Sequence, residues 1–217
     1  MSPFALVAIA LGHPDDALVA ARADVVAEAL ALPSGVGEDG LRAFLAWWAA
    51  EDPEELRRLY VETFDFSRRT SLDLTYFTHG DLRQRGLALL ALRRRYDAAG
   101  FELEGPELPD HLPVVLEFAA LDPEAGGAVL AEFRPVVEII RLALVHAGSP
   151  YAGLVTALCA LLPELTVADL AEVQRLAREG PPGEAVGLEP FGPPEVMPDP
   201  LRPARAGCSA ATMRGTR

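Results

Sequence analysis

Apolar residues recur every three or four positions through most of the chain. One such stripe contains Leu130, Phe133, Val137, Ile140 and Leu144, which would share one face of a helix. Three further stripes have the same spacing: Leu82, Leu89, Leu92 and Tyr96; Leu112, Val115, Leu116 and Ala119; and Tyr151, Leu154, Val155, Leu158 and Leu162. No segment alternates apolar and polar residues over the length of a strand, and Ala and Leu are far commoner than Val and Ile. The pattern therefore predicts an all-α protein.

Helix start and stop signals divide these stripes. An N-cap residue, an early proline or an acidic third residue marks four helix starts, at 52–55, 122–124, 149–150 and 166–169. Gly100 and Gly148 are typical of helix ends, and Pro135, which falls inside an apolar stripe, predicts a kink or a break. Together these signals predict a single-domain bundle of roughly eight to ten helices joined by short turns.

The character of the chain changes after Gly180. Residues 181–217 are rich in Pro and Gly, and their apolar residues have no period. Such a segment buries too little apolar surface to offset the entropy lost on ordering. We therefore expect a helical domain over residues 1–179 and a disordered tail over residues 180–217.

The charge of the chain limits its partners. Among 217 residues, 32 are acidic and 19 basic, so the net charge is −13. A strongly acidic surface repels nucleic acid and anionic lipid, which makes both poor partners, and it attracts basic peptides. The acidity is equally compatible with a role in solubility alone.

The N-terminal segment and the two cysteines point to the cytoplasm. Residues 1–11 are apolar but lack a basic region, so they are expected to be neither a signal peptide nor a membrane span. Cys159 lies in an apolar run and Cys208 in the tail, a spacing that suggests neither a disulfide framework nor a metal site. We expect a cytoplasmic protein without membrane insertion.

The sequence offers no catalytic motif. The histidines, His13, His79, His111 and His146, are far apart, and no metalloprotease, P-loop, C-x-x-C or nucleophile-elbow pattern is present. We therefore predict no enzymatic activity, no metal site and no cofactor.

Two segments differ from ordinary core helices. Residues 60–72 and 78–86 mix aromatic, hydroxyl and charged side chains with little apolar period, a composition typical of a groove lining. The alternative is a helix junction, in which Asp65 and Asp81 cap helices and the arginines pair locally.

The second segment is 107–118. Pro109 stiffens its beginning, Asp110 is in the position of an N-cap, and His111 and Glu117 add polar groups to an apolar helix. One interpretation places Asp110 and His111 at the mouth of a groove, where they receive an arginine or the backbone of a peptide. The other is a capped helix start with an exposed histidine.

Both segments resemble the signature stretches of the NarJ (nitrate reductase delta subunit) family. The Glu-x-Pro-Asp-His element at 107–111 also resembles the motif of the wider TorD-like maturation chaperones. Segments 149–151 and 159–163 are similar to the family too, and the resemblance extends roughly over residues 1–178. It implies an all-helical chaperone that acts in nitrate assimilation.

In the function that this resemblance implies, the protein binds the apo catalytic subunit of a respiratory nitrate reductase through that subunit's N-terminal segment and supports molybdenum cofactor insertion. The client-binding positions that it implies are Tyr60, Phe64, Asp65, Arg68, His79, Gly80, Asp81, Arg83 and Gly86 in the first stretch, and Glu107, Pro109, Asp110, His111 and Glu117 in the second. We expect a monomer or a weak homo-oligomer. The alternatives are a chaperone for another molybdoenzyme, of the N-oxide or dimethyl sulfoxide reductase type, and a stable helical subunit of an oxidoreductase complex.

Overall fold

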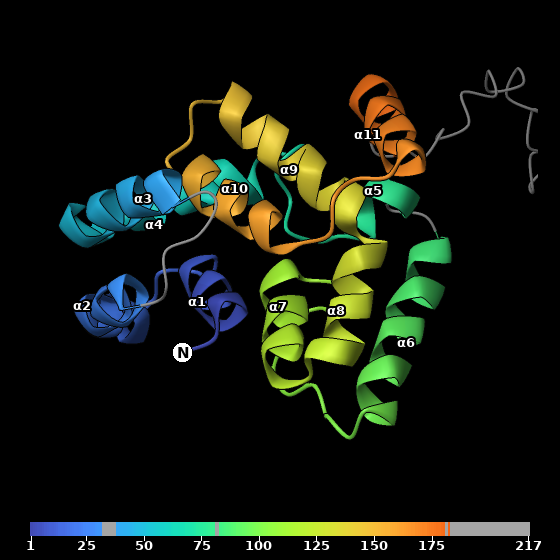
Figure 1. The fold of residues 1–217 in the computed structure, drawn as a ribbon, viewed down its shortest axis with the longest axis horizontal. Helices are drawn as coiled ribbons and strands as arrows, with labels where there is room; N and C mark the ends of the chain where they lie inside the picture. The colour runs from blue at the N-terminus through green and yellow to red at the C-terminus, as the bar shows by residue number, and fades with distance from the viewer. Residues whose placement is uncertain (32–37, 81–82, 181, 183–217) are drawn as a thin grey trace, which may run out of the picture. The chain divides into compact units, whose positions relative to one another are not determined.

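The computed structural model describes residues 1–31, 38–80, 83–180 and 182. These residues form eleven α-helices and one short π-helix (Figure 1): α1 Pro3–Ala10, α2 Asp16–Leu30, α3 Glu38–Ala50, α4 Pro53–Tyr60, the π-helix η1 Val61–Asp65, α5 Tyr76–His79, α6 Arg83–Ala98, α7 Leu112–Leu121, α8 Pro123–Glu132, α9 Arg134–His146, α10 Tyr151–Leu161 and α11 Val167–Glu179. Over the described ranges the one extended pairing is an isolated antiparallel bridge between Asp73 and His111. The all-α prediction is confirmed, with one helix more than the expected eight to ten.

Several predicted positions lie outside the described residues. Asp81 and Leu82 are among them, and so is the expected tail except for Gly180 and Pro182. The predicted division into a helical domain and a disordered tail therefore stays a prediction.

The local capping signals are confirmed where they were strongest. The Asp52 carboxylate accepts hydrogen bonds from the amides of Glu54 (2.9 Å) and Glu55 (3.3 Å) at the start of α4. Asp122 does the same at the start of α8. Thr166 opens α11 with a reciprocal capping box. These interactions need only neighbouring residues, so the sequence predicts them directly.

The predicted interruption at Pro135 is a break between two helices. α8 ends at Glu132, Phe133 separates the helices, and α9 begins at Arg134, which places Pro135 in the first turn of α9. A proline is tolerated in that turn because its missing amide would have no helical partner there.

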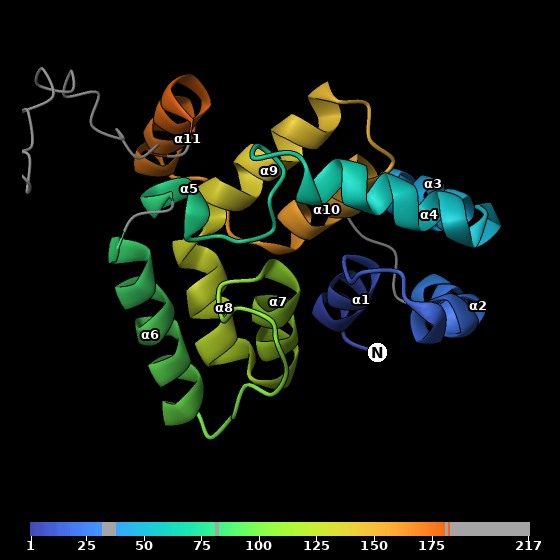
Figure 2. The ribbon, with the colours of Figure 1, turned by 180° about the vertical axis from the view of Figure 1, so that it is seen from behind.

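The core has two neighbouring regions. In the first, α7 packs against α1 and α8; in the second, α10 packs against α3 and α9 (Figures 1 and 2). Tyr151 of α10 lies at the centre of an aromatic group, with its ring 4.9 Å from Phe64, 5.4 Å from Phe44 and 5.6 Å from Trp47 between centroids. Burial of these rings stabilises this region.

Helices α7 and α8 approach each other closely at Gly126. A Cβ atom at this glycine would lie 2.8 Å from the carbonyl carbon of Phe118, and closer still to the backbone of Ala119. The absence of a side chain therefore sets the distance between the two helices.

No helix in the described ranges combines the length and the apolar character needed to cross a lipid bilayer.

Candidate functional site

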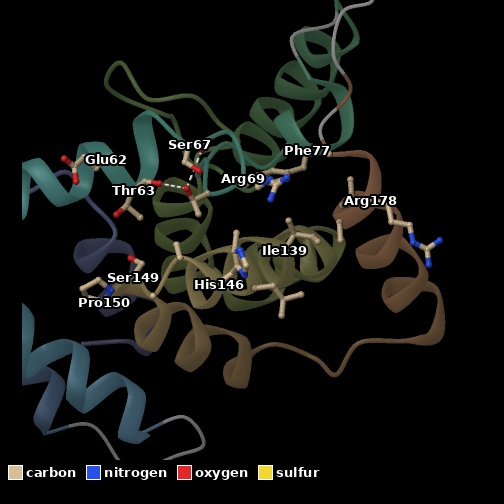
Figure 3. A pocket seen from close by; sticks show the side chains of 18 of the residues that line it. Glu62, Thr63, Ser67, Arg69, Phe77, Ile139, His146, Ser149, Pro150 and Arg178 are labelled. Atoms are coloured by element: carbon tan, nitrogen blue, oxygen red, sulfur yellow. Dashed lines mark hydrogen bonds between the residues drawn. The ribbon is translucent and has the colours of Figure 1, made fainter.

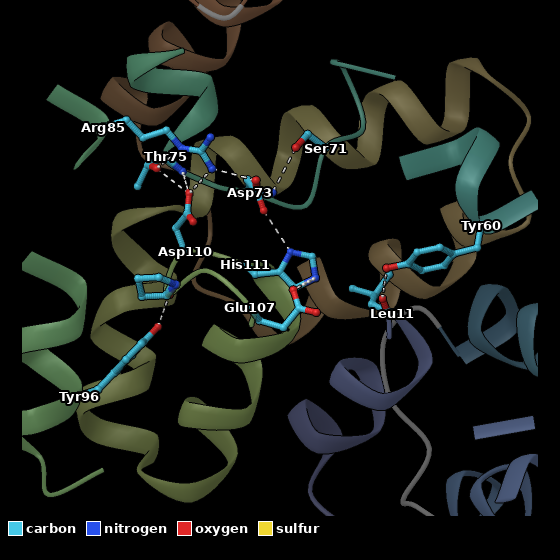
Figure 4. Close-up of polar contacts among 11 residues, drawn as sticks. Leu11, Tyr60, Ser71, Asp73, Thr75, Arg85, Tyr96, Glu107, Asp110 and His111 are labelled. Carbon is cyan, nitrogen blue, oxygen red and sulfur yellow. Dashed lines mark hydrogen bonds and ion pairs between the residues drawn. The ribbon is translucent and has the colours of Figure 1, made fainter. Parts of the chain in front are cut away.

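A buried carboxylate, Asp110, connects the two segments that the sequence singled out (Figure 4). Its side chain is 0% exposed. One of its oxygens accepts hydrogen bonds from the Thr75 amide (3.0 Å) and the Thr75 hydroxyl (2.5 Å), and lies 3.5 Å from a guanidinium nitrogen of Arg85. A buried charge needs such partners, because an unpaired one carries a large desolvation penalty.

The prediction that Asp110 caps α7 was wrong. The N-cap position of α7 is His111, and no side chain caps this helix start. Asp110 instead binds the segment that precedes α5, and its backbone carbonyl accepts from the Leu74 amide (3.0 Å). Thr75 supplies two hydrogen-bond donors to Asp110, and Arg85 supplies a positive charge. Tertiary packing brings these partners to Asp110, so local sequence reasoning could not identify them.

His111 is more restrained than the exposed histidine of one of the two interpretations. Its side chain is 19% exposed, and Nδ1 donates to a carboxylate oxygen of Asp73 at 3.1 Å. The other Asp73 oxygen accepts from Arg85 at 2.8 Å. The hydrogen bond from His111, assisted by Arg85, holds the pKa of the Asp73 carboxyl below its ordinary value of 3.8, although burial opposes this.

We define the polar network as Asp73, Thr75, Arg85, Asp110 and His111. Arg85 donates a hydrogen bond to Asp73 and forms an ion pair with Asp110, so it ties the start of α6 to the segments before α5 and α7. Asp73 and Thr75 lie outside the segments that the sequence analysis singled out, and Arg85 lies inside residues 78–86 but was not proposed as a site residue. Their contacts with one another and with Asp110 identify them.

Asp73→Asn is expected to lower the free energy of unfolding at neutral pH and to lose that effect in acid. Asp73 stabilises the fold fully above its unfolded pKa, and this contribution is lost as the pH falls through the lowered folded-state pKa. In urea unfolding, the difference in the free energy of unfolding between wild type and variant should become smaller below about pH 4. Asp24→Asn, on an exposed position of α2, is the control. If Asp73→Asn lowers the free energy of unfolding by the same amount at all pH values, the prediction is contradicted.

A cleft of about 460 Å³ opens beside His111. We call it the acidic cleft, and it brings together residues of α1 and its following turn, the end of α4 with η1, and the start of α7. Its lining residues are Ala8, Ile9, Gly12, His13, Tyr60, Asp65, Glu107, His111, Pro113, Val114 and Glu117. Five of the predicted site residues therefore share one cleft.

The polar wall of the acidic cleft is mainly negative. Asp65, Glu107 and Glu117 are exposed carboxylates, and Glu107 lies 4.0 Å from Nε2 of His111. The Tyr60 hydroxyl donates to the Leu11 carbonyl at 3.1 Å, and burial raises the pKa of this phenol, so it remains a neutral donor. Three carboxylates around an apolar floor are suited to a basic side chain that carries an apolar stem.

The π-helix η1 determines which residues of this stretch face the cleft. The amide of Phe66 donates to the carbonyl of Val61 (3.2 Å), an i to i+5 bond that widens the last turn after α4. Phe64 is buried against Tyr60 and Tyr151, whereas Asp65 next to it is exposed at the cleft. The widened turn thus separates an aromatic core residue from a charged lining residue.

The other predicted site residues do not join the cleft. Phe64 and Gly80 are buried, and the carbonyl of Pro109 accepts from the Tyr96 hydroxyl at 2.6 Å, so these positions support the fold. His79 lines a separate cavity of about 360 Å³ with residues of α6 and α9. Three are exposed outside the acidic cleft: Arg68, Arg83 and Gly86. Asp81 is outside the described residues.

A second concavity of about 570 Å³ is also bordered by η1 (Figure 3). We call it the apolar groove; α4, η1, α5, α9 and α11 line it. Its apolar residues come from four of these helices: Leu59, Phe77, Ile139, Leu142, Ala143, Leu176 and Ala177. Thr63, Ser67 and Arg69 belong to the first predicted segment, which therefore borders both concavities. The sequence analysis did not single out these apolar residues, because periodicity does not distinguish a core face from a groove wall.

Among the described residues, no group of three or more histidine, cysteine or carboxylate side chains is placed to hold a metal ion. Cys159 lies partly buried against the core, and burial raises the pKa of its thiol to about 12.

Comparison with known proteins gives a consistent set of relatives. A family model described as "Nitrate reductase delta subunit" matches residues 29–157. The "Probable nitrate reductase molybdenum cofactor assembly chaperone NarJ" of Bacillus subtilis (strain 168) is 34% identical over 170 residues, which is 78% of this chain and 92% of that protein. The "Nitrate reductase molybdenum cofactor assembly chaperone NarJ" of Escherichia coli (strain K12) is 33% identical, over 71% of this chain and 66% of that protein.

A further relative is much longer than this chain. The "Nitrate reductase-like protein NarX" of Mycobacterium tuberculosis (strain ATCC 25618 / H37Rv) is 41% identical over 133 residues. That match spans 61% of this chain but only 20% of NarX.

Proposed function

Because this chain belongs to the nitrate reductase delta subunit family, we propose that it acts as an assembly chaperone for a nitrate reductase and not as an enzyme. Relatives named as molybdenum cofactor assembly chaperones, aligned over most of the chain, support this role. The client in this proposal is the apo catalytic subunit, which the chaperone binds while the molybdenum cofactor is inserted.

The acidic cleft is the proposed site for the N-terminal segment of the client. The supporting observation is that Asp65, Glu107, His111 and Glu117, which are distant in sequence, line a single cleft. A basic residue of the client would enter between the carboxylates, and its apolar neighbours would lie on Val114 and the residues beside it. The net charge of −13 would favour the encounter with a basic segment.

The double variant Glu107→Gln/Glu117→Gln tests this site. We expect it to bind a synthetic peptide of the client's N-terminal segment about tenfold more weakly, since two partly exposed charge pairs are worth about 0.7 kcal/mol each. Isothermal titration calorimetry at two salt concentrations measures the loss, which should diminish at high salt because screening already weakens the wild type.

The matched control removes the same charge elsewhere. Glu124 and Glu164 are both exposed and lie outside the acidic cleft. Glu124→Gln/Glu164→Gln should bind the peptide within about twofold of wild type. An equal loss in both variants would mean that net charge alone drives binding, and a loss in neither would place the peptide elsewhere, with the apolar groove the next site to test.

Purification distinguishes a chaperone from a permanent subunit, and peptide binding distinguishes a nitrate reductase client from other reductases. A chaperone should copurify with the apo catalytic subunit and be absent from the mature reductase, whereas a stable subunit would be present in both. Preferential binding of the N-terminal peptide from an N-oxide or dimethyl sulfoxide reductase would reassign the client.

A further inference from the structure

The outer face of helix α6 is uncovered by the rest of the described chain. In both views α6 runs along the edge of the helical part of the molecule (Figures 1 and 2). Its inner face is fixed by the buried residues Leu92 and Tyr96. Positions spaced by four, three and four residues share one stripe of a helix, and on the opposite side of α6 these are Arg83, Leu87, Leu90 and Arg94.

This stripe is apolar at its centre and basic at both ends. Leu87 is 70% exposed and Leu90 is 45% exposed. Arg83 and Arg94 are exposed and form neither a hydrogen bond nor an ion pair within the described part of the chain, unlike Arg95 in the same helix, which is ion-paired. Two neighbouring exposed leucines form a contiguous apolar patch, and such a patch with a polar rim is typical of an interaction site.

We propose that this Arg-Leu stripe of α6 is a docking surface for an acidic protein surface with an apolar ridge. The proposal rests on the proposed function, because the partner is then the folded body of the client beyond its N-terminal segment. The two leucines would supply the desolvated centre of the contact, and the arginines the charge-paired rim.

Charge complementarity favours this partner. The chain has a net charge of −13, yet α6 carries five arginines and one acidic residue, Asp97. The acidic cleft and the Arg-Leu stripe are therefore opposite in charge. One client could engage both, with a basic N-terminal segment in the cleft and an acidic surface on α6, and two weak contacts on one molecule reinforce each other.

The same charges disfavour the other two occupants. In a symmetric dimer through α6, the stripe would meet its own copy, which places Arg83 and Arg94 against the arginines of the second chain. An anionic bilayer is extended, so it would also bring negative charge close to the acidic remainder of the protein, whereas a protein surface can confine its acidic residues to the stripe.

The test compares two ligands, the full-length apo catalytic subunit and its N-terminal peptide. Leu87→Ser/Leu90→Ser should bind the full-length subunit about tenfold more weakly and the peptide within about twofold of wild type. Arg83→Glu/Arg94→Glu should also weaken full-length binding, and salt should reduce the difference from wild type. Surface biosensor measurements with the purified full chain give both affinities.

The matched control replaces exposed leucines elsewhere. Leu121 and Leu161 are 66% and 45% exposed, nearly the same as the α6 pair. Leu121→Ser/Leu161→Ser should leave both affinities unchanged, and circular dichroism with thermal melting checks that every variant folds.

Each result either supports or contradicts the proposed docking surface. If wild type binds the peptide but both α6 variants bind the full-length subunit normally, the docking surface is wrong while the proposed function stands. If wild type binds neither ligand, both fail. Sedimentation tests self-association, and flotation with phosphatidylglycerol vesicles tests membrane binding. If wild type shows either behaviour and Leu87→Ser/Leu90→Ser removes it, the stripe has another occupant and the proposal is overturned.

Discussion

Gly126→Ala is expected to destabilise the protein by about 3 kcal/mol, although alanine is the better helix former. The added Cβ would overlap the backbone of Ala119 and Phe118 in α7, and backbone atoms cannot rotate away as a flexible side chain could. Helices α7 and α8 would have to separate, which opens the packed region that they form with α1. Equilibrium urea unfolding measures the change.

The next residue supplies the control. Gly127 lies in the same helix, and a Cβ there would meet nothing within 4 Å. Gly127→Ala should therefore stabilise the protein by up to about 1 kcal/mol, the usual difference between glycine and alanine in a helix interior. Two neighbouring identical substitutions with opposite signs would verify the close contact of α7 and α8. If both stabilise, the helices do not meet at Gly126.

Asp110→Ala is expected to cost about 3 kcal/mol, well above the roughly 1 kcal/mol of a lost N-cap. The substitution leaves the Thr75 hydroxyl and amide without their buried acceptor and removes one of the two carboxylates that pair with Arg85. Leaving buried polar groups unpaired is costly because they also lose their contact with water. Urea unfolding at neutral pH gives the magnitude.

Two further variants separate the explanations. Asp110→Asn keeps an acceptor for Thr75 but loses the charge, so it should fall between wild type and Asp110→Ala. Asp97→Ala, at an exposed aspartate of α6, should change the free energy of unfolding by less than about 0.5 kcal/mol. A cost near 1 kcal/mol for Asp110→Ala would mean that the contacts with Thr75 and Arg85 contribute little.

Some of the candidate site was predictable from the sequence, and some was not. The unusual composition of residues 60–72 and 107–118 marked these segments, and the family resemblance implied Tyr60, Asp65, Glu107, His111 and Glu117, which line one cleft. Their individual environments were not predictable. Composition marks a segment as different from a core helix, but it carries no information on which side chains of the segment are buried.

Local interactions are what the sequence by itself determined. Asp52, Asp122 and Thr166 cap helices as expected, because each bond joins residues two or three positions apart. The apolar stripes predicted an all-α fold, because a helix must bury one face. The break before Pro135 followed from the geometry of proline alone.

The tertiary structure alone decided the rest. Asp110 binds Thr75, 35 residues earlier, and so does not cap its own helix. Residues of α1 complete the acidic cleft, although nothing in residues 1–12 suggested a binding site. From the sequence, Gly126 is only a residue of low helix propensity, and its role in the close approach of α7 and α8 is visible only in the packed structure. In each case the partner belongs to a different helix or segment. Which helix faces meet determines the partners of a side chain, and this is a property of the packed bundle and not of any one segment.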